Sequence, residues 1–196
     1  MKLFILLDIS GSMEGAKIGA LNDSMSNIIM TLQESSVGEG SLELSILTIG
    51  KTAKWMYDRP KKIGDFAWIE QQANGMTPLG SACKELDVIL NDCSSSNDKV
   101  TIILLSDGCP TDDYENGIGV LNNNIVFVNS HRYVIALGED ADLKSLRQFA
   151  NDDAHLFTIN TMNQFFDTFM QVTADSKKPV SHTVTVQTED DDDEWS

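Results

Sequence analysis

The fold is decided by the stretch Leu3-Phe4-Ile5-Leu6-Leu7-Asp8-Ile9-Ser10-Gly11-Ser12, in which five apolar residues precede one carboxylate and two hydroxyls. An unbroken apolar run of this length is typical of a strand that is buried on both faces. Polar residues that follow such a strand lie at its carboxyl end. Oxygen donors gathered there are suited to a hard cation. We therefore expect Asp8 at a solvent-facing strand end, with Ser10 and Ser12 in the loop beside it.

Two later segments offer further oxygen donors. The segment Gly75-Met76-Thr77-Pro78-Leu79-Gly80 opens a predicted helix, and Ser106-Asp107-Gly108 follows the apolar run at residues 100–105. The candidate ligand set is Asp8, Ser10, Ser12, Thr77 and Asp107. Oxygen donors suit Mg²⁺ or Mn²⁺, and two protein carboxylates neutralise a divalent ion while leaving it able to take an outside carboxylate. The pattern predicts a metal that bridges to a partner.

These three segments follow the order D-x-S-G-S, then Thr in G-x-T-P, then Asp in S-D-G. The pattern resembles the metal-ion-dependent adhesion site of von Willebrand factor A domains. The resemblance extends from Lys2 to the predicted helix that ends near Val172, and His131–Gly138 is similar to a late strand and glycine of that family. It implies a metal-dependent protein-binding module that is not an enzyme, with a partner Asp or Glu completing the coordination.

The Thr77-Pro78 form and the compact chain are most similar to bacterial tellurium-resistance-type A-domain proteins, the TerY-like group. That resemblance implies a stress-response or tellurium-resistance setting and partners in a protein kinase and phosphatase signalling set. An adaptor for an ATPase is an alternative within the same class of binding modules. No residue spacing distinguishes these partners.

Each candidate ligand also has an ordinary structural interpretation. Asp8, Ser10 and Ser12 are common turn formers, and Asp107 before glycine is a common turn. Thr77 before proline is a good helix N-cap, with the proline at the first helical position. The joint occurrence at strand ends and a helix start, in the order of the family, favours the metal site.

An enzyme is the opposing hypothesis. Haloacid-dehalogenase-type phosphohydrolases, which depend on magnesium, also begin with a strand that ends in an aspartate, which would make Asp8 the nucleophile. That chemistry needs a second carboxylate two residues later, where this chain has Ser10. The glycines at 11, 15 and 19 do not form the G-x-G-x-x-G pattern of a dinucleotide site. We therefore predict no catalytic activity.

Composition limits the partners. The 196 residues carry a net charge of -16, which argues against binding to nucleic acid or to an anionic membrane. Asp8 interrupts the first apolar run before it reaches the length of a secretory leader, and no stretch reaches the about twenty apolar residues of a spanning helix. Cys83, Cys93 and Cys109 lack metal-type spacing, and Cys83 and Cys93 are expected to be reduced thiols, whereas Cys109 is interpreted as a small residue before Pro110. We expect a cytoplasmic protein.

Alternating strand and helix patterns predict a doubly wound α/β fold, with helices on both faces of a mostly parallel central sheet and one antiparallel edge strand. The predicted strands lie at residues 3–7, 42–49, 52–57, 100–105, 133–137 and 155–159. The predicted helices lie at residues 16–32, 79–90, 114–123, 143–150 and 162–172. Residues 63–72 are expected to be a short helical or irregular piece, and residues 125–128 are ambiguous.

The chain divides into one domain and a tail. We assign residues 1–176 to the von Willebrand factor A-like domain and residues 177–196 to an acidic, flexible tail, which contains six consecutive acids at 189–194. A solvated tail and an interaction element are both consistent with this composition, and Trp195 beside the acids is a reason to keep the second.

Overall fold

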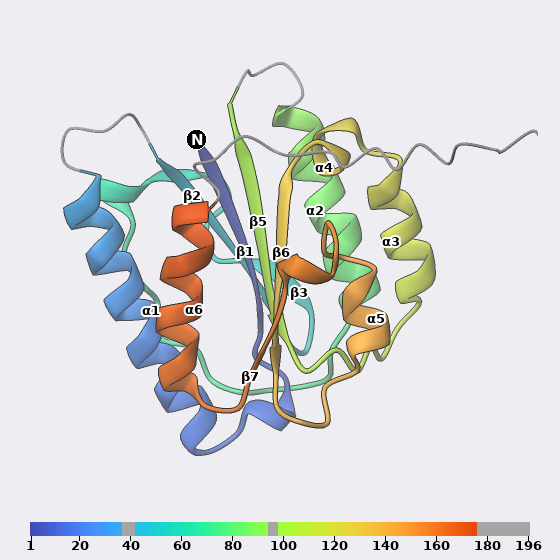
Figure 1. Cartoon of the computed structure of the whole chain (residues 1–196), viewed down its shortest axis with the longest axis horizontal. Coiled ribbons are helices and arrows are strands. Elements are labelled where there is room, and N and C mark those ends of the chain that lie inside the picture. Colours follow the sequence, from blue (N-terminus) through green and yellow to red (C-terminus); the bar gives the residue numbers. More distant parts are fainter. Residues whose placement is uncertain (37–41, 94–97, 176–196) are drawn as a thin grey trace, which may run out of the picture.

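A seven-stranded sheet runs through the centre of the protein in the order β3-β2-β1-β5-β6-β7, with β4 also paired to β2. The computed structural model (Figure 1) describes residues 1–36, 42–93 and 98–175. Its strands are β1 (Lys2–Asp8), β2 (Glu43–Ile49), β3 (Ala53–Trp55), β4 (Lys61–Lys62), β5 (Val100–Ser106), β6 (His131–Leu137) and β7 (Leu156–Ile159). The strands β1, β2, β5, β6 and β7 pair in parallel, whereas β3 and β4 run antiparallel to β2. The predicted doubly wound α/β fold with an antiparallel edge is confirmed.

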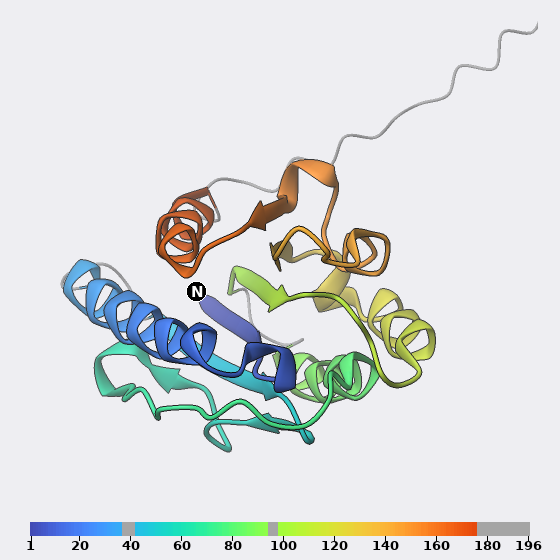
Figure 2. The ribbon, with the colours of Figure 1, turned by 90° about the horizontal axis from the view of Figure 1, so that it is seen from below.

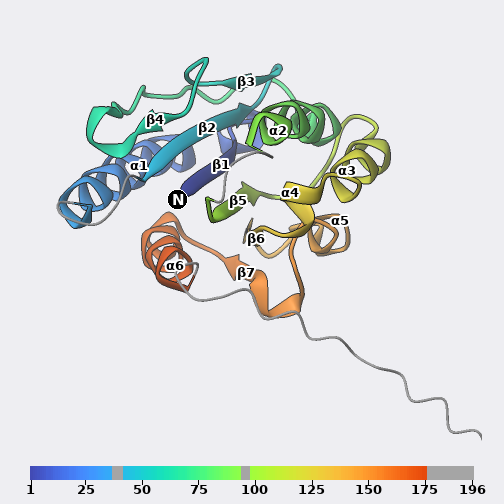
Figure 3. The same ribbon diagram turned by 90° about the horizontal axis from the view of Figure 1, so that it is seen from above.

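Helices cover both faces of this sheet. They are α1 (Ala16–Ser35), α2 (Leu79–Cys93), α3 (Tyr114–Asn122), α4 (Ile125–Val128), α5 (Leu143–Arg147) and α6 (Met162–Asp175). Figures 2 and 3, which view the molecule from its two ends, show α1 and α6 on one face and α2 to α5 on the other. In the described part of the chain, no helix combines the length and the apolar character needed to cross a bilayer.

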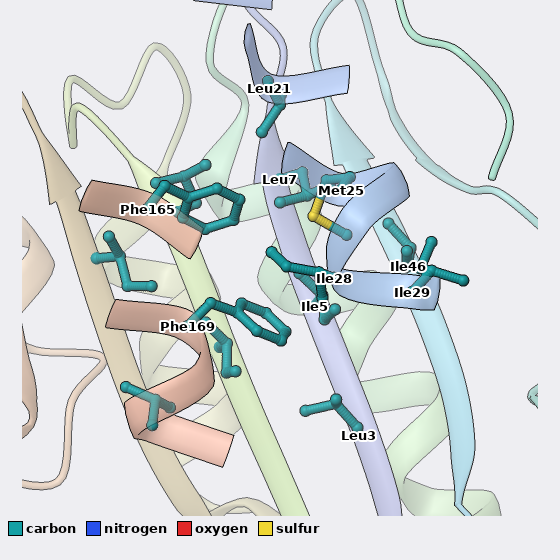
Figure 4. Close-up of a cluster of buried hydrophobic side chains, with 14 of the residues drawn as sticks. Leu3, Ile5, Leu7, Leu21, Met25, Ile28, Ile29, Ile46, Phe165 and Phe169 are labelled. Atoms are coloured by element: carbon teal, nitrogen blue, oxygen red, sulfur yellow. The ribbon is translucent and has the colours of Figure 1, made fainter. Parts of the chain in front are cut away.

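The strand β1 explains why the sheet is buried on both sides. Leu3, Ile5 and Leu7 point to one face and pack with side chains of α1 and α6 (Figure 4). Phe4 and Leu6 point to the other face and pack with the helices there. All five are at most 1% exposed. The continuous apolar run in the sequence is therefore the signature of a central parallel strand.

Several segments differ from the sequence-based expectation in detail. Residues 125–128 form the short helix α4, because the Asn124 side chain accepts hydrogen bonds from the N–H groups of Val126 and Phe127. Only Ile63–Asp65 of the segment at 63–72 is helical, as a 3₁₀ turn, and residues 66–78 form neither helix nor strand. The predicted tail at 177–196 lies outside the described residues, so the proposed domain boundary stays a prediction.

The topology brings the predicted loops to one edge of the sheet. The chain passes from β1 through α1 to β2 on one side, and α2 later returns it to β5 on the other side of β1. The register pairs Leu7 with Leu105, so Asp8 and Ser106 end neighbouring parallel strands. Ligand sites of doubly wound folds form beyond the carboxyl ends of strands at such a switch point.

Candidate metal centre

Hydrogen bonds between backbones hold the three predicted loops together beyond β1 and β5. The Gly11 N–H donates to the Gly75 carbonyl at 3.0 Å, which joins the loop after β1 to the segment before α2. The Thr111 N–H donates to the Thr77 carbonyl at 3.0 Å, which joins that segment to the loop after β5. The loops that carry all five candidate ligands are therefore in direct contact. The metal-binding role of those residues stays a prediction.

Asp8 lies beneath the surface, 1% exposed, and not at a solvent-facing strand end as expected. Its Oδ1 accepts from the Ser10 N–H at 2.9 Å, and its Oδ2 accepts from the Ser106 hydroxyl at 2.7 Å. Burial raises the pKa of Asp8, the hydrogen bonds from Ser10 and Ser106 lower it, and the charge of Asp107 raises it again, so the result is a raised pKa. A cation bound beside this buried carboxylate would favour its ionised form.

Ser10 and Ser12 present their hydroxyls side by side, with the two Oγ atoms 3.0 Å apart. The arrangement follows from a single 3₁₀ turn at Gly11–Met13, in which the Met13 N–H donates to the Ser10 carbonyl at 2.9 Å. Ser10 is buried and Ser12 is exposed. Two neutral oxygens therefore face each other at the mouth of the loop, one below the surface and one at it.

Thr77 is 5% exposed, and its backbone is fixed in two directions by Thr111. The Thr77 N–H donates to the Thr111 hydroxyl at 3.1 Å, and the Thr77 carbonyl accepts from the Thr111 N–H. Among residues 1–36, 42–93 and 98–175, no hydrogen bond to or from the Thr77 hydroxyl is found. The Thr77 hydroxyl is therefore not committed to a partner among these residues and is available to a ligand.

The interpretation of Thr77 as the helix cap is wrong. Asp112, from the loop after β5, caps α2 in its place. Its Oδ1 accepts from the Gly80 N–H at 2.7 Å, and its Oδ2 accepts from the Ser81 N–H at 2.7 Å and the Ser81 hydroxyl at 2.8 Å. Because a distant carboxylate satisfies the first turn of the helix, the Thr77 side chain is left free of that task.

Asp107 follows β5 and is half-buried. Its Oδ1 accepts from the Cys109 N–H at 3.3 Å, and its carbonyl accepts from the Asp142 N–H at 2.8 Å. Gly108 has a φ of 74°, and a Cβ there would lie 2.5 Å from the Leu146 side chain, so glycine is required at this turn. Partial burial raises the pKa of the Cys109 thiol, and the charges of the nearby Asp107 and Asp142 raise it further.

The donor set fits a hard divalent cation. It combines two carboxylates with three hydroxyls, and oxygen donors of this kind are the ligands of Mg²⁺ and Mn²⁺. No group of three or more His, Cys, Asp or Glu side chains suited to a metal occurs in the part of the chain that the structure describes.

The residues that support the candidate ligands were not predicted from the sequence. Ser106 is inside the S-D-G motif, but its hydrogen bond to Asp8 joins residues 98 positions apart. Thr111 and Asp112 lie in a loop whose only visible signal is its polarity. A polar residue at the last position of an otherwise apolar strand, as Ser106 is, was the one signal in the sequence that could have indicated a supporting role.

A family model described as von Willebrand factor type A domain matches residues 2–171. No curated protein matches the chain. Several solved structures are similar. The pilus adhesin SpaC from Lactobacillus rhamnosus GG, in its open conformation, has a TM-score of 0.72 and 13% identity, with 90% of this chain and 30% of that chain covered.

Two further solved structures resemble the chain. A von Willebrand factor type A protein from Catenulispora acidiphila has a TM-score of 0.67 and 22% identity, covering 89% of this chain and 42% of that chain. Proximal thread matrix protein 1 from the mussel byssus, with a zinc-occupied MIDAS motif, has a TM-score of 0.64 and 15% identity, covering 87% and 44%. The chain spans less than half the length of these three proteins, and identities this low show the shared fold alone.

Proposed function

Because the chain belongs to the von Willebrand factor type A family, we propose that it is a non-enzymatic protein-binding module that depends on a divalent cation. Domains of this family are typically metal-dependent adhesion or protein-binding modules. The observation that carries the proposal is the Thr77 hydroxyl, which has no hydrogen-bond partner in the described chain and belongs to a residue that is 5% exposed. It lies in a loop hydrogen-bonded to those that follow Asp8 and Asp107. The mussel protein with a zinc-occupied MIDAS motif supports the same assignment.

The candidate residues comprise charged and neutral oxygen donors. Asp8 and Asp107 would hold Mg²⁺ or Mn²⁺ through their carboxylates, and Ser10, Ser12 and Thr77 would hold it through neutral hydroxyls. The bound ion would supply an electrophilic position that an Asp or Glu of the partner completes. Ser106 keeps the Asp8 carboxylate in place through its hydroxyl at 2.7 Å. With only two protein carboxylates in the set, the site repels an incoming carboxylate less than a cage of four would.

We also propose which proteins this module binds. The Thr77-Pro78 form, similar to the bacterial tellurium-resistance-type group, supports a cytoplasmic signalling set with a protein kinase and a phosphatase. An ATPase is the alternative partner. A pull-down from the native host with magnesium, repeated with a chelator, tests both. Recovery of a kinase or phosphatase only with metal is expected, and recovery of an ATPase alone would favour the adaptor.

A phosphohydrolase finds no support in the site. The position two residues after Asp8 is occupied by Ser10, so the second carboxylate of the haloacid-dehalogenase-type mechanism is missing there. Both oxygens of the Asp8 carboxylate also accept hydrogen bonds in a buried position. These bonds suit a fixed ligand better than a nucleophile that must reach a substrate.

The first prediction is the stoichiometry of metal binding and the absence of turnover. Titration calorimetry with Mg²⁺ and Mn²⁺ should give one ion per chain for the wild-type protein, and a generic phosphoester assay should give no turnover. Asp107→Ala is the matched variant, because it removes one ligand from a half-buried position. Absence of divalent binding would refute the site, and metal-dependent hydrolysis that Asp8→Asn abolishes would refute the binding-module assignment.

A further inference from the structure

The segment that carries Thr77 toward the site is tethered by a side chain of α1. Asn22 lies on the buried side of that helix and is 7% exposed. Its Nδ2 donates to the Gln71 carbonyl at 2.9 Å, and its Oδ1 accepts from the Gln71 N–H at 2.8 Å. The same Oδ1 accepts from the Trp68 indole at 3.2 Å. The amide of Asn22 thus bonds the backbone of Gln71 in both directions, as a neighbouring strand would.

This tether matters because residues 66–78 form neither helix nor strand. The backbone bonds of this segment to the loop after β1 are made farther along, at residues 74 and 75. A surface cavity of about 460 Å³ lies here, lined by residues at the start of α1 and by residues 70–73. Gly15, which precedes α1, and Gly19, on its first turn, have open space where a Cβ would lie. The Asn22 amide therefore links α1 to the backbone of Gln71 beside this cavity.

A second asparagine fixes the segment closer to the ligand. The backbone N–H of Asn74 donates to the Ile9 carbonyl at 2.8 Å, and the side-chain Oδ1 of Asn74 accepts from the Lys51 N–H at 2.9 Å. The next residue, Gly75, has a φ of 69°, and a Cβ there would lie 2.4 Å from the Lys51 backbone. Asn74 therefore fixes the segment that leads to Thr77 to both the loop after β1 and the turn after β2.

We propose that Asn22 and Asn74 are positioning residues of the metal site, which act by holding the 68–77 segment so that the Thr77 hydroxyl lies at the carboxyl edge of the sheet. The proposal rests on the proposed function, because it assigns Thr77 to the metal. Neither asparagine is itself a ligand. Outer partners that orient metal ligands typically contribute about 10–100-fold to metal affinity.

A double-mutant cycle on Mn²⁺ affinity tests this inference. Asn74→Ala and Asn22→Ala should each weaken Mn²⁺ binding by about tenfold, and Thr77→Val should weaken it by itself. If the asparagines act through Thr77, either alanine variant should have little further effect in the Thr77→Val background. Additive effects in the double variants would overturn the proposal, because a general loosening of the fold would persist without the Thr77 hydroxyl.

Asn151→Ala is the matched control. The Asn151 side chain also bridges backbone groups, accepting from the Arg132 N–H and donating to the Ser130 carbonyl, but at the amino end of β6, away from the site. It should lower the free energy of unfolding without changing Mn²⁺ affinity. An equal loss of Mn²⁺ affinity in this control would overturn the proposal as well.

Hydrogen exchange tests the two tethers without metal, and Mn²⁺ binding separates the positioning role from the proposed function. Hydrogen exchange of apo protein should show faster exchange at the Gln71 amide in Asn22→Ala and at the Lys51 amide in Asn74→Ala, because each amide loses its acceptor. If wild-type protein binds no Mn²⁺, the proposed function fails. If wild-type protein binds Mn²⁺ and the asparagine variants bind it equally well, the positioning role alone fails.

Discussion

At the scale of single residues, the two carboxylates of the site differ in how they are held. Asp8 is buried and accepts hydrogen bonds at both oxygens, whereas Asp107 is half-buried and accepts one at Oδ1. The charge of Asp107 raises the pKa of Asp8, so the two repel each other without a cation. A divalent ion would replace this repulsion by attraction to both.

We predict that Asp107→Ala removes metal binding while the apo protein unfolds at an equal or higher denaturant midpoint, because the repulsion of Asp8 is relieved. Asp8→Asn should also remove metal binding, with the Ser10 N–H still able to donate to the side chain at position 8. Calorimetry with Mn²⁺ and chemical unfolding of apo protein measure the two effects. Unfolding of apo Asp107→Ala at a clearly lower midpoint would contradict this account.

At the scale of elements, α2 depends on a cap from a separate loop. Asp112 accepts three hydrogen bonds from Gly80 and Ser81, and a Cβ at Gly80 would lie 2.4 Å from the Asp113 carbonyl. The start of α2 and the loop after β5 are therefore built against each other. Since the loop also carries Asp107, capping of the helix and placement of this candidate ligand are coupled.

We predict that Asp112→Ala lowers the free energy of unfolding of apo protein by about 1–2 kcal/mol, the cost of losing a helix cap. Thr77→Val is the matched control, because Thr77 adjoins the same helix without capping it. Thr77→Val should change the free energy of unfolding by less than Asp112→Ala does. It should also weaken metal binding, because it removes a candidate ligand. Chemical unfolding of both variants checks the order, and a larger loss in Thr77→Val would restore Thr77 as the cap.

Whether a helix, strand or support can be predicted from the sequence depends on whether the interactions that form it are local or join distant residues. The strands β1 and β5 are visible in the sequence because burial on both faces leaves unbroken apolar runs. The helix α4 is too short for periodicity and forms through the Asn124 cap, and β4 has only two residues, Lys61–Lys62. The ligand types follow from local motifs, whereas the supports from Ser106 and Asp112 join distant positions and leave no local pattern.

At the scale of the whole molecule, the site is formed by contacts between segments that are far apart in the chain. The Ser106 hydroxyl reaches Asp8 across 98 positions, and Asp112 reaches Gly80 across 32. The loops that meet there follow β1 and β5 and precede α2. A cation shared by these loops would bind the folded chain and not the unfolded one, so binding is linked to global stability.

The last prediction is therefore a metal-dependent rise in the melting temperature. Free metal at one hundred times its dissociation constant should stabilise the fold by about 2.7 kcal/mol, which corresponds to about 5–10 °C for a domain of this size. Differential scanning calorimetry of wild-type protein across a series of Mn²⁺ concentrations at constant ionic strength measures the rise. Asp107→Ala should show no shift over the same series, since it lacks one of the two charged ligands. A shift of equal size in Asp107→Ala would mean that the ions act elsewhere on the acidic surface, because a net charge of -16 attracts divalent cations without any specific site.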